Sequence, residues 1–172
     1  LVTANSGNST MDVFLGNGDL TFQGRQNYGG LNDPQYLEIA DFDNDGYPEI
    51  VVSNQGNSTL HVFKNANGGF STANKIVLST AVSPREVRAA DINGDGILDL
   101  AVLCAQNNPG NRVSIFLGKG DGTFNGRVDV ATNTQSSFGM VLGSFYGQKT
   151  DLIVMQRGAS PYTAVLLQNV SQ

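Results

Sequence analysis

Apolar residues along this chain fall in short runs of about four to eight residues, rich in valine, isoleucine, leucine and phenylalanine. Clusters of glycine, asparagine and aspartate separate these runs. Short apolar runs bounded by turn-forming residues are typical of β-strands, whereas an amphipathic helix needs a longer stretch with a period near 3.6. The pattern therefore predicts an all-β fold.

The sequence also repeats itself at a spacing of about fifty residues. The strongest pair is ADFDNDGYPEIVVSN at residues 40–54 and ADINGDGILDLAVLC at residues 90–104. A third copy, LGSFYGQKTDLIVM at residues 142–155, keeps the apolar run but has lost most of the acidic residues. The chain is therefore predicted to hold about three and a half copies of one structural unit.

A second motif supports the same repeat. Its copies are VFLGNGDLTF, VFKNANGGF, IFLGKGDGTF and the shortened VLLQN, at residues 13–22, 62–70, 115–124 and 165–169. This alignment assigns one repeat position to Phe14, Phe63, Phe116 and Leu166. We place the units at residues 1–33, 34–83, 84–135 and 136–172.

Each complete unit contains four predicted strands, which in the second unit are residues 34–42, 49–54, 60–65 and 74–80. Glycine-containing turns join the third and fourth strands, so the unit is predicted to be an antiparallel meander. Sheets that repeat at this period stack radially as the blades of β-propellers. The chain opens on a second strand and closes on a third, so we expect a partial propeller, or one completed by a neighbouring chain.

Two acidic segments carry the candidate chemistry. Oxygen-bearing side chains stand at positions 1, 3, 5 and 9 of each segment, with glycine at position 6: Asp41, Asp43, Asp45, Glu49 and Gly46, then Asp91, Asn93, Asp95, Asp99 and Gly96. Calcium requires six to eight oxygen ligands, and the position-7 carbonyls of Tyr47 and Ile97 would add one to each set. We predict two structural Ca²⁺ sites. The alternative is that these residues only form turns between strands.

Composition excludes several function classes. The formal net charge of −5 argues against a nucleic-acid partner, and two bound Ca²⁺ ions would bring that charge close to neutrality. The lone cysteine, Cys104, excludes an intrachain disulfide and is expected to be a buried apolar residue. No apolar run approaches the ~20 residues of a membrane span. With a single histidine, His61, expected at a surface or an edge, the chain is predicted not to be an enzyme.

The two acidic segments, together with LGNGDLTF and LGKGDGTF, resemble FG-GAP/VCBS-type repeats, the blades of calcium-binding propellers such as the integrin α-subunit head and several secreted lectin-like propellers. The resemblance implies that each acidic loop joins the first two strands of a blade and binds Ca²⁺ through its own five ligand positions named above. Glu49 stands where aspartate is usual. The loop at residues 143–151 departs from the pattern, carries a lysine, and should bind no metal.

Three N-x-[ST] sequons, at Asn8, Asn57 and Asn169, are candidate glycosylation sites. The first two lie in the same GNST turn of successive units, which suits a secreted, extracellular protein, although Asn-Ser is also ordinary turn chemistry. Four tyrosines outside the repeat positions could line a sugar-binding face or pack in loops: Tyr28, Tyr36, Tyr146 and Tyr162.

The leading hypothesis is a non-catalytic, extracellular binding or adhesion module stabilised by Ca²⁺, whose protein or glycan ligand the sequence does not identify. One alternative is a structural subunit that self-assembles into a filament or ring by pairing the open strands at the ends of the chain. A second alternative is a lectin-like propeller that binds glycans between its blades.

Overall fold

The computed structural model describes residues 1–105, 111–132, 137–144, 150–156 and 164–167. These residues form antiparallel β-sheets, with one short 3-10 helix, η1 (Ser6–Asn8), so the all-β prediction is confirmed. None of the described residues lies in a helix long and apolar enough to cross a membrane.

The strands form four successive sheets in chain order. The first contains β1 (Val2–Asn5), β2 (Thr10–Val13) and β3 (Gln26–Tyr28). The second contains β4 (Pro34–Ala40), β5 (Glu49–Asn54), β6 (Thr59–Phe63) and β9 (Ile76–Ser79), with a small hairpin of β7 (Asn65–Ala66) and β8 (Gly69–Phe70) between its last two strands.

The remaining strands continue the pattern. The third sheet contains β10 (Pro84–Ala90), β11 (Asp99–Cys104), β12 (Arg112–Phe116) and β13 (Val128–Ala131). The fourth contains β14 (Ser137–Gly143), β15 (Asp151–Gln156) and β16 (Ala164–Leu167). In the described residues these four sheets contain three, four, four and three strands, which confirms the four-stranded complete units, and each sheet lies within one predicted unit.

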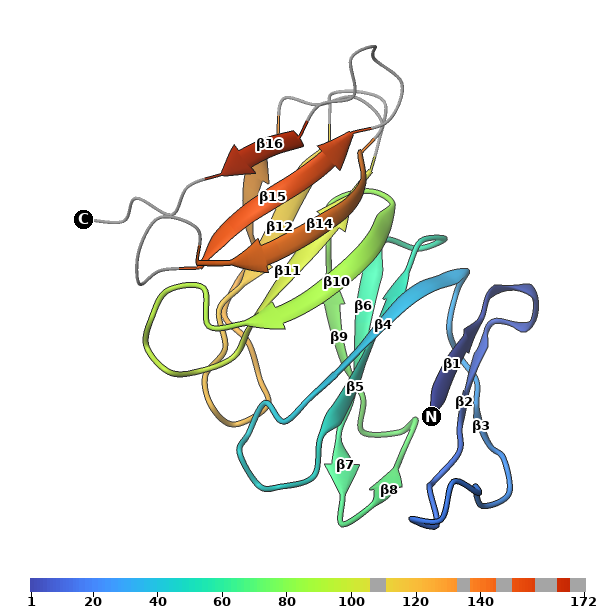
Figure 1. Cartoon of the computed structure of the whole chain (residues 1–172). Coiled ribbons are helices and arrows are strands. Elements are labelled where there is room, and N and C mark those ends of the chain that lie inside the picture. Colours follow the sequence, from blue (N-terminus) through green and yellow to red (C-terminus); the bar gives the residue numbers. More distant parts are fainter. Residues whose placement is uncertain (106–110, 133–136, 145–149, 157–163, 168–172) are drawn as a thin grey trace.

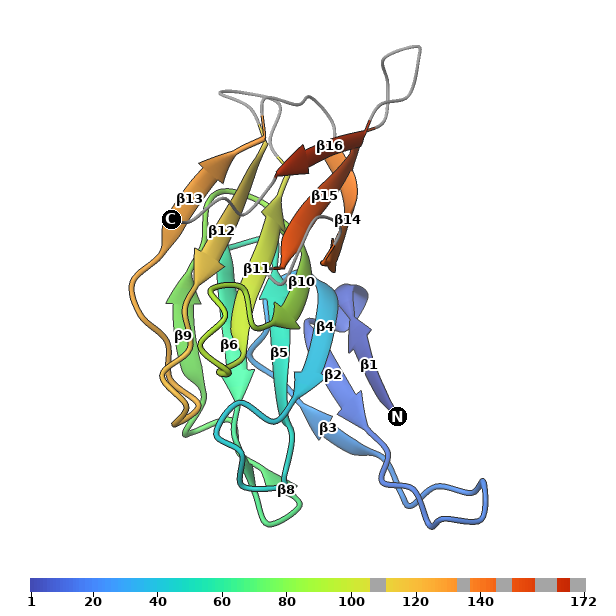
Figure 2. The ribbon, with the colours of Figure 1, turned by 60° about the vertical axis from the view of Figure 1, so that its left-hand side comes forward.

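The sheets follow one another like blades, with the β1–β3 sheet and the β14–β16 sheet at opposite ends of the molecule (Figures 1 and 2). The first strands of the second, third and fourth units lie side by side and exchange polar contacts. The Ala89 N–H in β10 donates to Glu38 Oε1 in β4 at 3.3 Å, and the Met140 N–H in β14 donates to Glu86 Oε2 in β10 at 2.8 Å. This arrangement is that of partial propeller blades.

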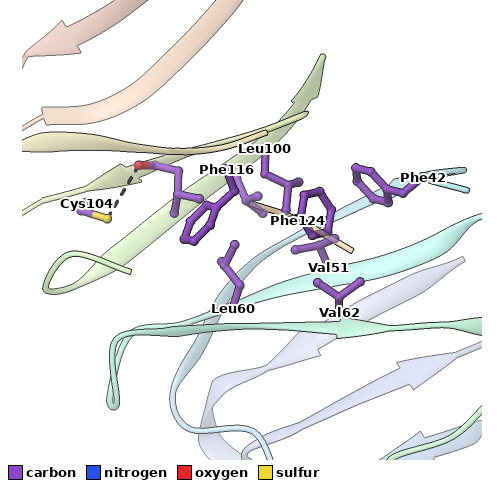
Figure 3. Packing of buried hydrophobic residues seen from close by; sticks show 10 residues of the cluster. Phe42, Val51, Leu60, Val62, Leu100, Cys104, Phe116 and Phe124 are labelled. Carbon is purple, nitrogen blue, oxygen red and sulfur yellow. Dashed lines mark hydrogen bonds between the residues drawn. The ribbon is translucent and has the colours of Figure 1, made fainter. Parts of the chain in front are cut away.

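Hydrophobic cores fill the spaces between blades because the central strands are buried on both faces. In β5, Val51 faces the third sheet, whereas Ile50 and Val52 face the first. The core between the second and third sheets is the largest (Figure 3), and it contains Phe42, Val51, Leu60, Val62, Val87, Leu100, Val102, Cys104, Phe116 and Phe124. Because successive side chains of a strand point to opposite faces of the sheet, a central strand packs against the blades on both sides.

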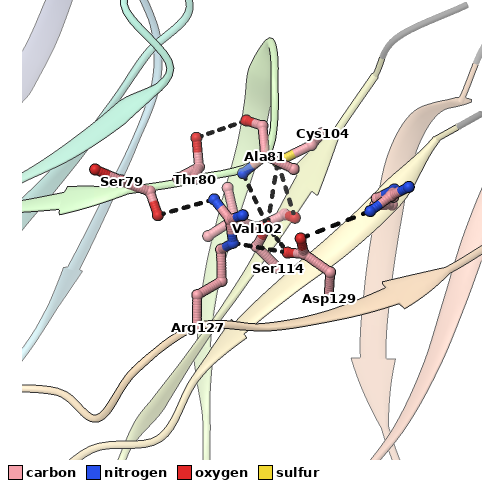
Figure 4. Close-up of polar contacts among 9 residues, drawn as sticks. Ser79, Thr80, Ala81, Val102, Cys104, Ser114, Arg127 and Asp129 are labelled. Atoms are coloured by element: carbon pink, nitrogen blue, oxygen red, sulfur yellow. Dashed lines mark hydrogen bonds and ion pairs between the residues drawn. The ribbon is translucent and has the colours of Figure 1, made fainter. Parts of the chain in front are cut away.

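Polar contacts also cross between the second and third sheets, around Ser114 (Figure 4). The Ser114 hydroxyl donates to Asp129 Oδ1 at 2.7 Å and accepts from the Ala81 N–H at 3.2 Å. Arg127 pairs with the same carboxylate oxygen at 3.1 Å and donates to the Ser79 carbonyl at 3.2 Å. The segment after β9 is therefore fixed to the third sheet by polar as well as apolar contacts.

The register of the fourth sheet corrects one repeat assignment. Phe63 pairs with Ile50 and Phe116 with Leu100, each the second residue of its partner strand. The second residue of β15 is Leu152, and it pairs with Leu167. The repeat position therefore belongs to Leu167, and the assignment to Leu166, which is exposed, was wrong by one residue. Because two leucines are adjacent, alignment of the sequence repeats does not reveal a shift of one residue, although such a shift exchanges the two faces of a strand.

Candidate metal centre

Both acidic loops lie where the first strand of a four-stranded blade turns into the second, between β4 and β5 and between β10 and β11. The first aspartate of each loop organises the turn. Asp41 accepts the Asp45 and Gly46 N–H groups at 3.2 and 2.9 Å. Asp91 accepts the corresponding Asp95 and Gly96 N–H groups at 3.1 and 2.8 Å.

The glycine at position 6 is needed for this geometry. Gly46 has a φ of 87° and Gly96 a φ of 84°, a left-handed conformation that is strained for residues with a Cβ atom. The sequence pattern thus specifies the same reversal in both loops.

The first loop brings three carboxylates together. Asp41, Asp43 and Glu49 each contribute an oxygen to a group whose members all lie within 4.8 Å of one another. Ionised carboxylates at this separation repel by about 1–4 kcal/mol per pair at effective dielectric constants of 80 to 20. Such a cluster fits a divalent cation, which would remove that repulsion.

Glu49 is the most deeply buried member of the cluster. Its side chain is completely buried, and Oε2 accepts the Phe42 N–H at 2.9 Å. Oε1 has no hydrogen-bond partner, and neither does the buried Oδ1 of Asp43. Burial raises the pKa of Glu49, and the nearby Asp43 charge adds to this, while the N–H groups of Phe42 and Asn65 oppose the shift. Of these two N–H groups, only that of Phe42 donates a hydrogen bond to the Glu49 carboxylate.

Asp45, another predicted ligand of the first loop, is not a member of this group of side chains. The Asp45 side chain is exposed, and its Oδ1 accepts the Tyr47 N–H at 2.8 Å. The Tyr47 carbonyl stays a predicted ligand.

The second loop makes the same turn, but the hydrogen bonds of its carboxylate oxygens differ from those in the first loop. Asp99 is completely buried, with Oδ1 accepting the Gly118 N–H at 2.8 Å and Oδ2 accepting the Ile92 N–H at 2.9 Å. Asn93 turns its amide nitrogen toward Asp95 Oδ2 at 2.8 Å. Both Asp99 oxygens therefore already have backbone partners, whereas in Glu49 only Oε2 has one. Ligation by this loop, including the Ile97 carbonyl, stays a prediction.

The chain length of the ninth residue explains the difference between the loops. Glu49 and Asp99 both accept the N–H of the second loop residue. Glu49 is longer than Asp99 by one methylene, and its other oxygen, Oε1, has no hydrogen-bond partner, whereas the other oxygen of Asp99 accepts the Gly118 N–H at the start of the next hairpin. The structure thus separates two loops that the sequence pattern treats as equal.

The third loop is described only at its ends, because residues 145–149 lie outside the described part. Thr150 donates its hydroxyl to the Asp91 carbonyl at 2.7 Å, so this loop contacts the second acidic loop. The expectation that it binds no metal stays a prediction.

The paired sequons occupy equivalent turns. Asn8 and Asn57 are both exposed, and each precedes a serine in the left-handed conformation, Ser9 at φ 55° and Ser58 at φ 56°. Asn169 lies outside the described residues. Glycan attachment stays a prediction at all three.

Besides the Leu166 assignment, one sequence-based prediction is wrong, and one residue beside the candidate site was not predicted. His61 was expected at a surface or an edge, but it is 5% exposed, because its strand β6 lies between β5 and β9 and its ring packs against Phe63. Lys64, which forms an ion pair with Asp43 Oδ2 at 3.6 Å, had no motif to mark it. Comparison of the units could have found it, since Leu15 and Leu117 stand at the same position.

The tyrosines outside the repeat positions pack within the fold where they are described. Tyr28 makes edge contacts with Phe63 and Phe70, and the Arg88 guanidinium lies 5.0 Å from the Tyr36 ring centre. Tyr146 and Tyr162 lie outside the described residues. Cys104, 2% exposed, is the buried residue that was predicted.

Comparison with known proteins agrees with the architecture and the loops. A sequence model described as an FG-GAP-like repeat matches residues 1–52 and again residues 41–102, which together span more than half of the chain. No curated protein matches the chain. The repeated motifs, the blade-like sheets and these two matches show that the chain belongs to the FG-GAP-like repeat family.

Proposed function

We propose that this protein is a calcium-stabilised propeller-type module that presents a rigid binding surface to a macromolecular partner outside the cell. One observation carries the calcium assignment: the group of Asp41, Asp43 and Glu49, in which a completely buried carboxylate oxygen has no hydrogen-bond partner. Bound calcium would supply positive charge at this group and so stabilise the turn between β4 and β5.

The chain's residues suit a structural role for this site. Phe42, next to the first ligand, is buried in the core between the second and third sheets. Fixing Asp41 and Asp43 therefore also fixes an anchor of the interface between two blades. The second loop, with Asp91, Asn93, Asp95 and Asp99, is proposed as a weaker site, because its ninth-position carboxylate is already satisfied.

Binding or adhesion, rather than catalysis, is what the family membership supports, since FG-GAP-like repeats are typically binding modules. The exposed, equivalent positions of Asn8 and Asn57 are compatible with the extracellular location. Calcium modules of that environment work with dissociation constants of about 10⁻⁴–10⁻³ M, which extracellular calcium can occupy.

Thermal unfolding in EGTA, in millimolar Ca²⁺ and in millimolar Mg²⁺ tests the proposal. Calcium at ten times its Kd stabilises a single site by about 1.4 kcal/mol, which corresponds to a rise in Tm of several degrees for a chain of this size. Magnesium should stabilise less, because it retains its water ligands.

Glu49→Gln should remove most of the calcium-dependent rise in Tm, since it deletes the charge of the buried ligand. Asp19→Asn is the matched control, because Asp19 lies in an exposed hairpin turn and bonds only to Thr21. A melting curve of the wild type that is the same in EGTA and in Ca²⁺ would refute the calcium role.

A second candidate function, self-association, is favoured by one surface feature. Leu20 is 99% exposed and Phe22 is 52% exposed, both in the hairpin after β2. In the third sheet the equivalent Phe124 is only 8% exposed and packs against Phe42 of the preceding blade. The first hairpin could pack in the same way on a second copy. Light scattering should show a concentration-dependent dimer that Phe22→Ser abolishes, and a strictly monomeric wild type would exclude this function.

A further inference from the structure

We infer that Lys64 is a built-in counter-ion of the first acidic loop, which weakens its affinity for calcium and connects it to the third blade. The inference rests on the proposed calcium site and concerns what sets its affinity. It is drawn from a contact that neither acidic motif contains.

The contact joins three segments that are distant in the sequence. Lys64 follows β6 directly, and its Nζ lies 3.6 Å from Asp43 Oδ2. The same Nζ donates to the Asp121 carbonyl at 2.7 Å, in the hairpin after β12 of the third sheet. The ammonium group is therefore held between the acidic loop of one blade and the hairpin of the next.

The hairpin is shaped to accept this lysine. Gly122 has a φ of 73°, and a Cβ atom there would lie 3.0 Å from both Cε and Nζ of Lys64 and 3.4 Å from Asp43 Oδ2. The equivalent residue of the first hairpin is Leu20, with a φ of 70°, so the backbone conformation alone does not require glycine. What Gly122 supplies is room for the ammonium and carboxylate groups.

Apolar packing holds the hairpin in place independently of the charge. The rings of Phe124 and Phe42 meet edge to face with their centres 5.3 Å apart. Loss of the Lys64 charge should therefore leave the hairpin docked and change mainly the electrostatics of the acidic loop.

The lysine is specific to the second blade. The corresponding residues of the first and third units are Leu15 and Leu117, so the repeat itself does not require a charge at this position. The lysine stands beside the loop in which three carboxylates gather and a buried oxygen lacks a partner. Both the place of Lys64 beside this loop and its absence from the equivalent positions of the first and third units connect the lysine with that loop.

The effect has opposite signs without and with calcium. Without the metal, the ammonium offsets repulsion between the carboxylates and stabilises the loop. A cation at the same carboxylates meets a like charge only a few ångströms away, and a partly exposed charge at that range changes Kd by about three- to tenfold. Lys64→Met should therefore bind calcium more tightly and melt at a lower temperature in EGTA.

Calcium titrations followed by amide NMR test this for each loop separately, with the Gly46 resonance reporting the first loop and Gly96 the second. Lys64→Met should lower the Kd read at Gly46 three- to tenfold and leave the Kd read at Gly96 within twofold of wild type. Lys64→Arg, which keeps the charge, and Lys119→Met, which removes an exposed charge elsewhere in the hairpin, should both stay within twofold at Gly46. Raising the salt concentration should reduce the difference between wild type and Lys64→Met.

The outcomes separate this inference from the proposed function. If wild type binds calcium at Gly46 and Lys64→Met binds it equally or more weakly, the counter-ion role is wrong. If Lys64→Met has an unchanged Tm in EGTA, the stabilising role in the metal-free loop is wrong. A wild type that shows no calcium response at either glycine refutes the calcium site itself.

Discussion

His61 shows how burial changes the chemistry of a single side chain. Its ring is 5% exposed, it contacts Phe63, and its Nδ1 has no hydrogen-bond partner. Burial, assisted by the positive charge of Lys75, lowers the pKa of His61 to about 4. The folded protein therefore keeps this histidine neutral at pH values where the unfolded chain protonates it.

This pKa shift predicts a loss of stability in mild acid. Because the folded pKa lies below the unfolded value near 6.5, the stability is complete above pH 6.5 and falls as the pH drops toward 4. Between pH 7 and pH 5 the loss should be about 2 kcal/mol. His61→Phe removes the titrating group. In urea unfolding, the free energy of unfolding of the variant minus that of the wild type should therefore increase by about 2 kcal/mol as the pH falls from 7 to 5. Parallel curves for the two proteins would show that the pKa of His61 is not lowered.

The two hairpins that follow β2 and β12 show that the same element can have different roles. Both are closed by the same backbone bonds, from Asn17 to Thr21 and from Lys119 to Thr123, each at 3.0 Å. Both also contain an isolated bridge from glycine to phenylalanine. The local sequence therefore determines the hairpin, and its neighbours determine whether the phenylalanine is buried.

We predict that equivalent truncations in these hairpins have unequal effects on stability. Phe124→Ala should destabilise the protein by about 3 kcal/mol, because it leaves a cavity against Phe42 in the core between two blades. Phe22→Ala, at an exposed position, should change the free energy of unfolding by less than about 1 kcal/mol. Urea denaturation of both variants provides the comparison, and equal losses would contradict the packing described for Phe124.

At the level of the whole molecule, two glutamate side chains, Glu86 and Glu38, link blades that share no strand. The Glu86 side chain, from a residue 8% exposed, accepts the Met140 N–H of the fourth sheet and pairs with Arg88 at 2.6 Å. Glu38 makes the corresponding link from the second sheet to the third, but with longer contacts of 3.3 Å to the Ala89 N–H and 4.0 Å to Arg88. The link to the fourth sheet is therefore the stronger of the two.

Removal of the Glu86 carboxylate should therefore destabilise the protein more than removal of the Glu38 carboxylate. Glu86→Ala leaves the Met140 N–H without its acceptor and the Arg88 guanidinium with only the longer contact to Glu38, and should destabilise the protein by about 3 kcal/mol. Glu38→Ala should cost about 1 kcal/mol or less, since its contacts are long and more exposed. Hydrogen exchange at Met140 should accelerate in the first variant and stay near the wild-type rate in the second. The reverse order would show that these bonds do not hold the blades together.

The sequence by itself determined the strands, the repeat and the positions of the acidic loops. These depend on local rules: the period of two in β5 and β11, and the turn that Gly46 and Gly96 allow. Burial of Cys104 was also predictable, because it ends an apolar run in a central strand.

Only the tertiary structure decided which of these local features act together. It showed that the buried Glu49 lies in a group of carboxylates and keeps one oxygen without a hydrogen-bond partner, while Asp99 holds the next hairpin, a difference that no spacing rule contains. It also placed Lys64 beside Asp43 and the Asp121 carbonyl, since these residues lie on different loops that meet only in the folded protein. Periodicity fixes where a side chain points along its own strand, whereas charge, burial and metal affinity depend on which neighbouring blade it meets.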